Sequence, residues 1–189
     1  MSQASKEQAI NAIKTLLSYI GLNQEDEHLN GTAKRVINSF EELYGGYKKT
    51  AYDVIGEKFY TPPAGSQDMI LLKNIDFSST CTHHMLPIIG NTSIAYIPTT
   101  KIVGISKIVK IVEVFARRLQ IQENMTAEIA HALQENLQPQ GVAVKISATH
   151  HCMVSRGVRQ RQTIMDTYFF TGVFKEDKQL KNEFINSLR

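Results

Sequence analysis

Apolar residues recur at helical spacing in the first third of the chain, which predicts two amphipathic helices before any strand. Their apolar faces carry Ile10, Ile13, Leu16, Leu17 and Ile20 in the first helix and Val36, Ile37, Phe40 and Leu43 in the second. Gly21 is placed to end the first helix, and Thr32 is placed to cap the second. Because Pro62-Pro63-Ala64-Gly65 is typical of a loop, we expect an N-terminal helical segment over residues 1–65 and a second domain over residues 66–189.

Beyond this loop the pattern changes to β-prone segments that are interrupted by two more helices. The predicted strands cover roughly residues 69–77, 93–98, 142–149 and 164–174. In the third strand apolar residues alternate with small or polar ones, as expected when one face of a strand is buried. Ser106 and Thr126 are predicted to cap the two intervening helices. A short helix carrying Leu180, Phe184 and Leu188 closes the chain.

This order of elements predicts the α+β fold class, with a mainly antiparallel sheet of four strands. A sheet of this kind has two edge strands whose backbone groups lack partners. We therefore expect copies of the chain to associate through these edges.

Composition and charge exclude several classes of partner. The 189 residues are 42% hydrophobic and 21% charged, which is ordinary for a globular protein, and the net charge is only +3. Since there is no long basic run, no binding to nucleic acid is indicated. The first residues form neither a signal peptide nor an apolar span, so we expect a cytoplasmic protein without membrane association.

Both cysteines of the chain lie beside histidines. The two segments read Cys81-Thr82-His83-His84 and His150-His151-Cys152. Two thiolates and one imidazole suit zinc, and three protein ligands with an open fourth position are typical of a catalytic zinc site. We therefore predict that Cys81, His84 and Cys152 bind Zn²⁺. The alternatives are two buried thiols near unrelated histidines and a purely structural zinc site.

The predicted ligand set leaves other histidines for proton transfer. An imidazole titrates near neutral pH and can act as a general acid or base. His83 and one of His150 or His151 are the candidates. For His83, a surface position without a chemical role is the alternative.

A basic cluster at the start of a predicted helix could bind a polyphosphate. Lys107 and Lys110 follow Ser106 there, although cations near a helix N-terminus oppose the helix dipole. A bound polyanion would explain the arrangement, because amides and ammonium groups would then face the same negative charge. Taken alone, these residues favour a solvated helix face.

Two further polar segments are candidates for nucleotide binding. A carboxylate at Glu123, beside Gln122, can accept two N–H bonds from the edge of guanine. An ordinary connection between helices is the simpler explanation of this pair. The basic stretch over residues 155–161 suits phosphate and a solvated loop equally well.

Together these motifs resemble the GTP cyclohydrolase I family. The resemblance covers most of the chain and is strongest over residues 79–174. The matching stretches are Ser79-Thr80-Cys81-x-His83-His84, Ala95-Tyr96-Ile97-Pro98, Gly104-Ile105-Ser106-Lys107, Arg117-Arg118-x-Gln120-x-Gln122-Glu123, and His150-x-Cys152 with Arg156-Gly157. Several independent motifs in one order are far more specific than any one of them.

The resemblance implies a tunnelling fold, an antiparallel sheet with two helices packed on one side. It also implies a toroidal homodecamer with active sites at the subunit interfaces. By position, Cys81, His84 and Cys152 match the zinc ligands of the family. His83 and His150 match its proton-transfer histidines.

The resemblance also implies the residues that bind the substrate, GTP. Ser106 matches a residue that contacts the substrate and takes part in later proton transfers. Lys107 and Arg156 match triphosphate contacts, and Lys110 stands where the family usually has arginine. Arg35 resembles a further triphosphate contact that reaches in from a neighbouring subunit. The guanine-binding pair of the family is matched by Gln122 and Glu123.

The implied activity is the first step of pterin biosynthesis. Water attacks C8 of GTP, the imidazole ring opens, formate is released, and an Amadori rearrangement leads to 7,8-dihydroneopterin triphosphate. The chain has Thr82 where the family usually has glutamate. Two alternatives stay open: a paralogue that stops at a ring-opened intermediate or uses another purine nucleotide, and a non-catalytic nucleotide-binding homologue.

Overall fold

The computed structural model describes residues 3–23, 26–65 and 68–188. The chain divides into two compact units, Met1–Gly45 and Gly46–Arg189. Within the described ranges, no helix has the length and apolar character needed to cross a membrane.

The first unit is built from paired helices. Its helical segments are α1 (Lys6–Tyr19), the 3-10 turn η1 (Glu27–Leu29) and α2 (Thr32–Leu43). A capping box starts α1, since Ser5 accepts from the amide of Gln8 and the Gln8 side chain accepts from the amide of Ser5. Both predicted helices are confirmed, but the N-cap of α2 is Gly31 in a left-handed conformation, so the prediction of Thr32 is wrong by one residue.

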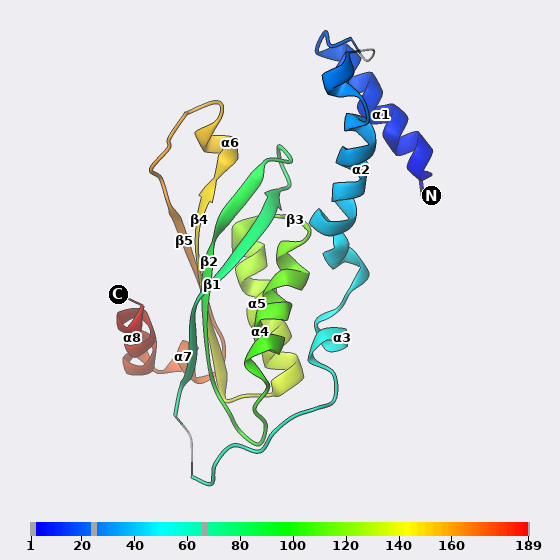
Figure 1. The fold of residues 1–189 in the computed structure, drawn as a ribbon. Helices are drawn as coiled ribbons and strands as arrows, with labels where there is room; N and C mark the ends of the chain where they lie inside the picture. Colours follow the sequence, from blue (N-terminus) through cyan, green and yellow to red (C-terminus); the bar gives the residue numbers. More distant parts are fainter. Residues whose placement is uncertain (1–2, 24–25, 66–67, 189) are drawn as a thin grey trace. The chain divides into compact units, whose positions relative to one another are not determined.

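The second unit is a five-stranded sheet with helices on both faces (Figure 1). Its strands are β1 (Ile70–Cys81), β2 (Pro87–Ile97), β3 (Leu119–Gln120), β4 (Gly141–His150) and β5 (Met165–Phe170). Its helical segments are η2 (Gly45–Lys48), α3 (Ala51–Ile55), α4 (Ile105–Ala116), α5 (Gln122–Leu137), α6 (His151–Val154), α7 (Val173–Glu176) and α8 (Lys178–Ser187). Figure 1 shows α4 and α5 side by side on one face of the sheet, with α7 and α8 on the other.

The strand order is β3-β1-β2-β4-β5, and every pair is antiparallel except β1 and β3. Helices α4 and α5 lie between β2 and β4 in the chain, so the expected α+β class and tunnelling fold are confirmed. The expected number of four strands is wrong by one. The additional strand is β3, in which Leu119 pairs with Thr80 and Gln120 pairs with Cys81.

The alternation in β4 places its side chains on two different cores. Val142, Val144 and Ile146 are fully buried in the larger core beneath α4 and α5. Ala143 belongs instead to a smaller core with Phe174 and Phe184, where α7 and α8 cover the opposite face. The period-two prediction for this strand is therefore confirmed.

Two predicted helix caps are wrong. Helix α4 begins at Ile105 with Gly104 as its N-cap, so Ser106 lies inside the first turn. Helix α5 begins at Gln122, and Thr126 lies inside it with its hydroxyl donating to the Gln122 carbonyl at 2.7 Å. As a result, the Gln122-Glu123 pair forms the start of α5 and is not a connection between helices.

Candidate metal centre and active site

The turn that follows β1 is fixed by backbone hydrogen bonds. The amide of Met85 donates to the carbonyl of Cys81 at 2.9 Å, and the amide of Thr82 donates to the carbonyl of Gln120 at 3.0 Å. Met85 has a φ of 53°, a left-handed conformation that is uncommon outside glycine. The backbone of the turn, anchored on β3, thus places Cys81 and His84 on one side of the hairpin.

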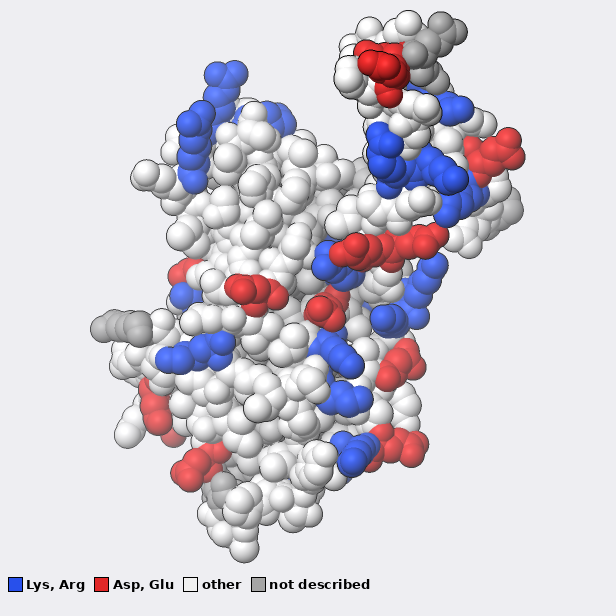
Figure 2. Space-filling view, in the orientation of Figure 1, with Lys and Arg blue, Asp and Glu red and all other residues white. Residues whose placement is uncertain are grey.

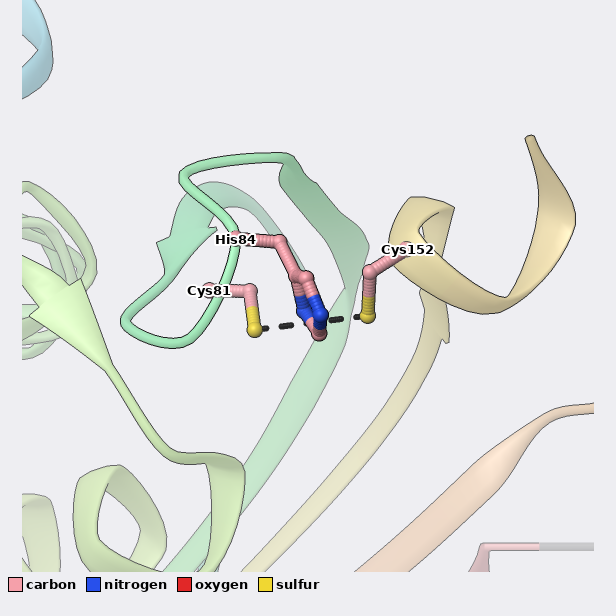
Figure 3. A group of neighbouring side chains, drawn as sticks. All are labelled: Cys81, His84 and Cys152. Atoms are coloured by element: carbon pink, nitrogen blue, oxygen red, sulfur yellow. Dashed lines mark hydrogen bonds between the residues drawn. The ribbon is translucent and has the colours of Figure 1, made fainter. Parts of the chain in front are cut away.

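Cys152 completes a group of three possible metal ligands from a distant part of the chain. It lies on α6, and Figure 3 shows the side chains of Cys81, His84 and Cys152 converging, with a dashed line that joins the two sulfurs. One ligand atom from each residue lies within 4.8 Å of the other two. The two sulfurs are 4.0 Å apart, and two thiolates bound to one tetrahedral zinc at about 2.3 Å would lie about 3.8 Å apart.

The protonation of these groups also suits a cation. Burial raises the pKa of the Cys152 thiol, and the neighbouring Cys81 adds to the effect. A metal ion would relieve this penalty because it stabilises thiolates. Arg156 Nη1 lies 2.7 Å from His84 Nε2, and since a guanidinium can only donate, the lone pair of this nitrogen faces Arg156, and a metal ion bound to it would replace that contact. Two thiols and one imidazole form a donor set that fits a metal ion such as zinc.

His83 lies next to this group without belonging to it. Its Nδ1 is 3.8 Å from the Cys81 sulfur, and its ring meets the His84 ring edge to face at 6.4 Å between centroids. The side chain of His83 is exposed. We call Cys81, His84 and Cys152 the metal group. The position of His83 leaves its ring accessible to a substrate at this group.

His150 occupies the other side of the site, at the end of β4. Its Nε2 lies 2.9 Å from Oε1 of Gln122. Burial lowers the pKa of His150, and the negative charge of Glu123 partly opposes the shift. Glu123 is exposed in the first turn of α5. Thus the structure brings together His150, Gln122 and Glu123, three of the predicted site residues.

The loop that follows α6 adds positive charge near the metal group. Residues 155–164 are exposed, and their only charged side chains are Arg156, Arg159 and Arg161. Figure 2 shows Lys and Arg side chains over this part of the second unit. Of the three arginines, Arg156 contacts the metal group directly through His84.

The predicted phosphate cluster lies far from the metal group of the same chain. Ser106 and Lys107 are in the first turn of α4 and Lys110 is near its middle, whereas the other end of this helix leads to β3 beside Cys81. Twelve helical residues span about 18 Å. Ser106 and Lys110 are exposed, and the Lys107 ammonium donates to the Val54 carbonyl at 2.8 Å.

Arg35 belongs to the first unit. It lies on α2, where its guanidinium donates to the Asn30 carbonyl at 2.9 Å and to the Thr32 hydroxyl at 2.7 Å. The structure does not place it in the group around Cys81.

One positioning residue was missed by sequence reasoning. The carbonyl of Gln120 accepts from Thr82, and its side chain donates to the Phe115 carbonyl and to Glu128, both at 3.0 Å. It thereby ties the metal-binding turn to α4 and α5. The only sequence signal was its place in the Arg117–Glu123 motif, because a strand of two residues produces no alternating pattern.

Three ligand atoms for a metal, with two further histidines and an exposed carboxylate beside them, define a metal-dependent enzyme. The chain belongs to the GTP cyclohydrolase I family, which it matches over residues 9–189. It is 50% identical over 186 residues to GTP cyclohydrolase 1 of Rickettsia felis, covering 98% of this chain and 97% of the relative. With the Rickettsia africae enzyme of the same name the identity is 51% over the same shares.

Among solved structures, two similar chains are an archaeosine synthase QueF-Like protein and the Escherichia coli dihydroneopterin aldolase. The first is 16% identical with a TM-score of 0.47, over 55% of this chain and 93% of that one. The second is 13% identical with a TM-score of 0.43, over 56% of this chain and 99% of that one.

Proposed function

We propose that this protein is a zinc-dependent GTP cyclohydrolase I, which converts GTP and water to 7,8-dihydroneopterin triphosphate and formate. Family membership over residues 9–189 supports the reaction. The single observation that carries the proposal is the approach of Cys81, His84 and Cys152, whose ligand atoms lie within 4.8 Å of one another.

Cys81, His84 and Cys152 would hold the zinc ion. When bound, zinc supplies Lewis acidity that activates water for attack near neutral pH. His83, exposed beside the metal group, would donate a proton to the purine nitrogen next to C8 as the ring opens. His150 would transfer protons on the opposite side of the substrate.

Glu123 would select guanine. Its exposed carboxylate stands in the first turn of α5 and can accept from N1 and from the 2-amino group of guanine. Adenine presents no such pair of donors, and the carboxylate would be left desolvated without partners. The carboxylate therefore discriminates between the two purines.

The triphosphate would be held by two sets of cations. Arg156 lies on the metal group itself, within hydrogen-bonding distance of His84. Along α4, Lys107 is about 14 Å and Lys110 about 9 Å from the helix end that leads to the metal group, and their ammonium groups would come from another copy of the chain. Ser106 would approach the substrate from that copy too, and Arg35 would come from a neighbouring subunit. This separation supports a homo-oligomer with shared active sites, a decamer by family resemblance.

The test is to incubate the zinc-loaded protein with GTP and to measure formate and pterin in the same samples. We expect equal amounts of both, with pterin detected by its fluorescence after oxidation. Formate without pterin would mean that the reaction stops after ring opening, as in a diverged paralogue. Release of neither product, with zinc bound, would contradict the proposed activity.

A further inference from the structure

The Gln122 side chain is buried, with only 1% of the residue exposed, although it lies beside the exposed Glu123. All of its polar atoms already have partners within the protein. Its Nε2 lies 2.9 Å from the Met165 carbonyl, 3.2 Å from the Ile146 carbonyl and 3.1 Å from the Thr167 hydroxyl. Its Oε1 faces His150 Nε2 at 2.9 Å. An amide engaged in this way has both of its hydrogens committed within the protein.

The orientation of this amide follows from its partners. Ile146 and Met165 present carbonyl oxygens, which can only accept hydrogen bonds. If the amide were rotated by 180°, Oε1 would face these two oxygens and both contacts would be repulsive. Nε2 therefore faces the two strands, and Oε1 faces His150.

The two threonines beside the amide support the same orientation. The Thr126 hydroxyl donates to the Gln122 carbonyl at 2.7 Å, so its oxygen can accept from Thr167 at 2.7 Å. The Thr167 oxygen can then share a hydrogen of Gln122 Nε2, whose two hydrogens face three acceptors. Each hydroxyl hydrogen has one acceptor, and the network needs no reversal of the amide.

A fixed acceptor at Oε1 determines which nitrogen of His150 carries hydrogen. Because Oε1 can only accept, Nε2 must be the N–H donor, and the lone pair of the neutral ring then lies on Nδ1. We propose that Gln122 is a positioning residue that holds His150 in the Nε2–H tautomer, so that Nδ1 is the atom that receives a proton from the substrate and returns it. The role goes beyond guanine binding and rests on the proposed cyclohydrolase activity.

The kinetic test uses two substitutions on α5. Gln122→Met keeps the approximate shape of the side chain and removes both the acceptor toward His150 and the donor toward β4 and β5. Gln134→Met is the matched control, since Gln134 also bonds through both amide atoms, to the Pro139 carbonyl at 3.0 Å and the Thr171 hydroxyl at 2.7 Å. We expect kcat of Gln122→Met to fall at least tenfold with KM for GTP within twofold, and the control to keep its kcat. A higher KM at unchanged kcat, or an equal loss of kcat in the control, would overturn the proposal.

A spectroscopic test does not depend on turnover. In protein labelled with ¹⁵N in its six histidines, solid-state NMR distinguishes protonated from bare ring nitrogens, and a His150→Gln sample identifies the signals of His150. We expect a protonated Nε2 and a bare Nδ1 in the unmodified protein, and a mixture of tautomers in Gln122→Met. The reverse assignment would overturn the proposal. Failure of the cyclohydrolase activity itself would appear separately, as an unmodified protein that releases no formate.

Discussion

The metal group and the start of α4 carry the two halves of one predicted active site, yet only the metal group is assembled within a single chain. Cys81 and His84 share a turn, and Cys152 reaches them through the pairing of β2 with β4. Ser106 stays exposed in the first turn of α4, a helix about 18 Å long, and Lys110 stays exposed near its middle. The comparison shows that one chain brings the predicted metal ligands together, whereas in the proposed function Lys107 and Lys110 would come from a second copy.

The largest expected effect comes from removing a ligand of the metal group. Cys152→Ala leaves two ligands, which do not hold zinc in a catalytic site, so we expect loss of bound zinc and a fall in formate release of about 1000-fold or more. Metal analysis together with the formate assay checks both. Met153→Ala, on the same short helix α6, is the control and should keep its zinc. Full activity of Cys152→Ala would mean that the three residues are not a metal site.

Replacing His83 should separate proton transfer from metal binding. We expect His83→Ala to lose about 10²- to 10⁴-fold in kcat, the usual contribution of a general acid or base, with an unchanged zinc content. Simultaneous loss of zinc would instead identify His83 as a ligand. The same preparation serves for both measurements.

The shared-site arrangement can be tested by mixing two defective subunits. Cys152→Ala lacks the metal half and Lys107→Ala lacks the phosphate half, so each alone should be nearly inactive at low GTP. If the halves come from different copies, coexpression in equal amounts should restore about a quarter of the sites, because random pairing joins two intact halves with that frequency. Absence of any recovery, with mixed oligomers present, would show that each chain carries its whole site.

The smallest expected effect is on stability, and it concerns Asp166 on β5 and its partners on β4. Burial alone would raise the pKa of Asp166, but hydrogen bonds from Ser147 and Lys145 outweigh it and hold the pKa below the ordinary 3.8. Because the pKa of Asp166 is lower in the folded chain than in the unfolded chain, its carboxylate stabilises the fold at pH values above 3.8. This stabilisation is lost as the pH falls through the lower pKa of the folded state.

Since the Asp166 side chain is 42% exposed, we expect Asp166→Asn to lower the free energy of unfolding by less than about 1 kcal/mol at neutral pH. The difference from the unmodified protein should shrink below about pH 4. Denaturant unfolding at several pH values measures this, with Asp76→Asn on an exposed site of β1 as the control. A difference that stays constant down to pH 2 would contradict the assignment.

The sequence predicted the parts of this fold that depend on periodicity. The alternation around Val144 and Ile146 identified β4 correctly, and helical spacing located α4 and α5. The start of α5 was misplaced because Thr126 is a typical capping residue, whereas the true N-cap, Ile121, makes no side-chain cap. Short elements such as β3 depend on tertiary contacts and leave no periodic signal.

The candidate site was predictable to a similar extent. The group of Cys81, His84 and Cys152 was predicted from two separate segments that each place a cysteine beside histidines, and the structure brings the three residues together. The burial of Gln122 was not predictable, since it follows from the packing of α5 against β4 and β5. Likewise, only the three-dimensional course of α4 shows that Ser106 lies at the helix end away from Cys81.

The two cysteine sulfurs, 4.0 Å apart as free thiols, also make the protein sensitive to oxidants. A disulfide requires a separation of about 2.05 Å, so an approach of about 2 Å would consume two of the three ligands in a single event. Bound metal opposes that reaction by occupying both thiolates. Storage under reducing conditions, or with zinc present from purification onward, should therefore preserve activity that air exposure of the metal-free protein would remove.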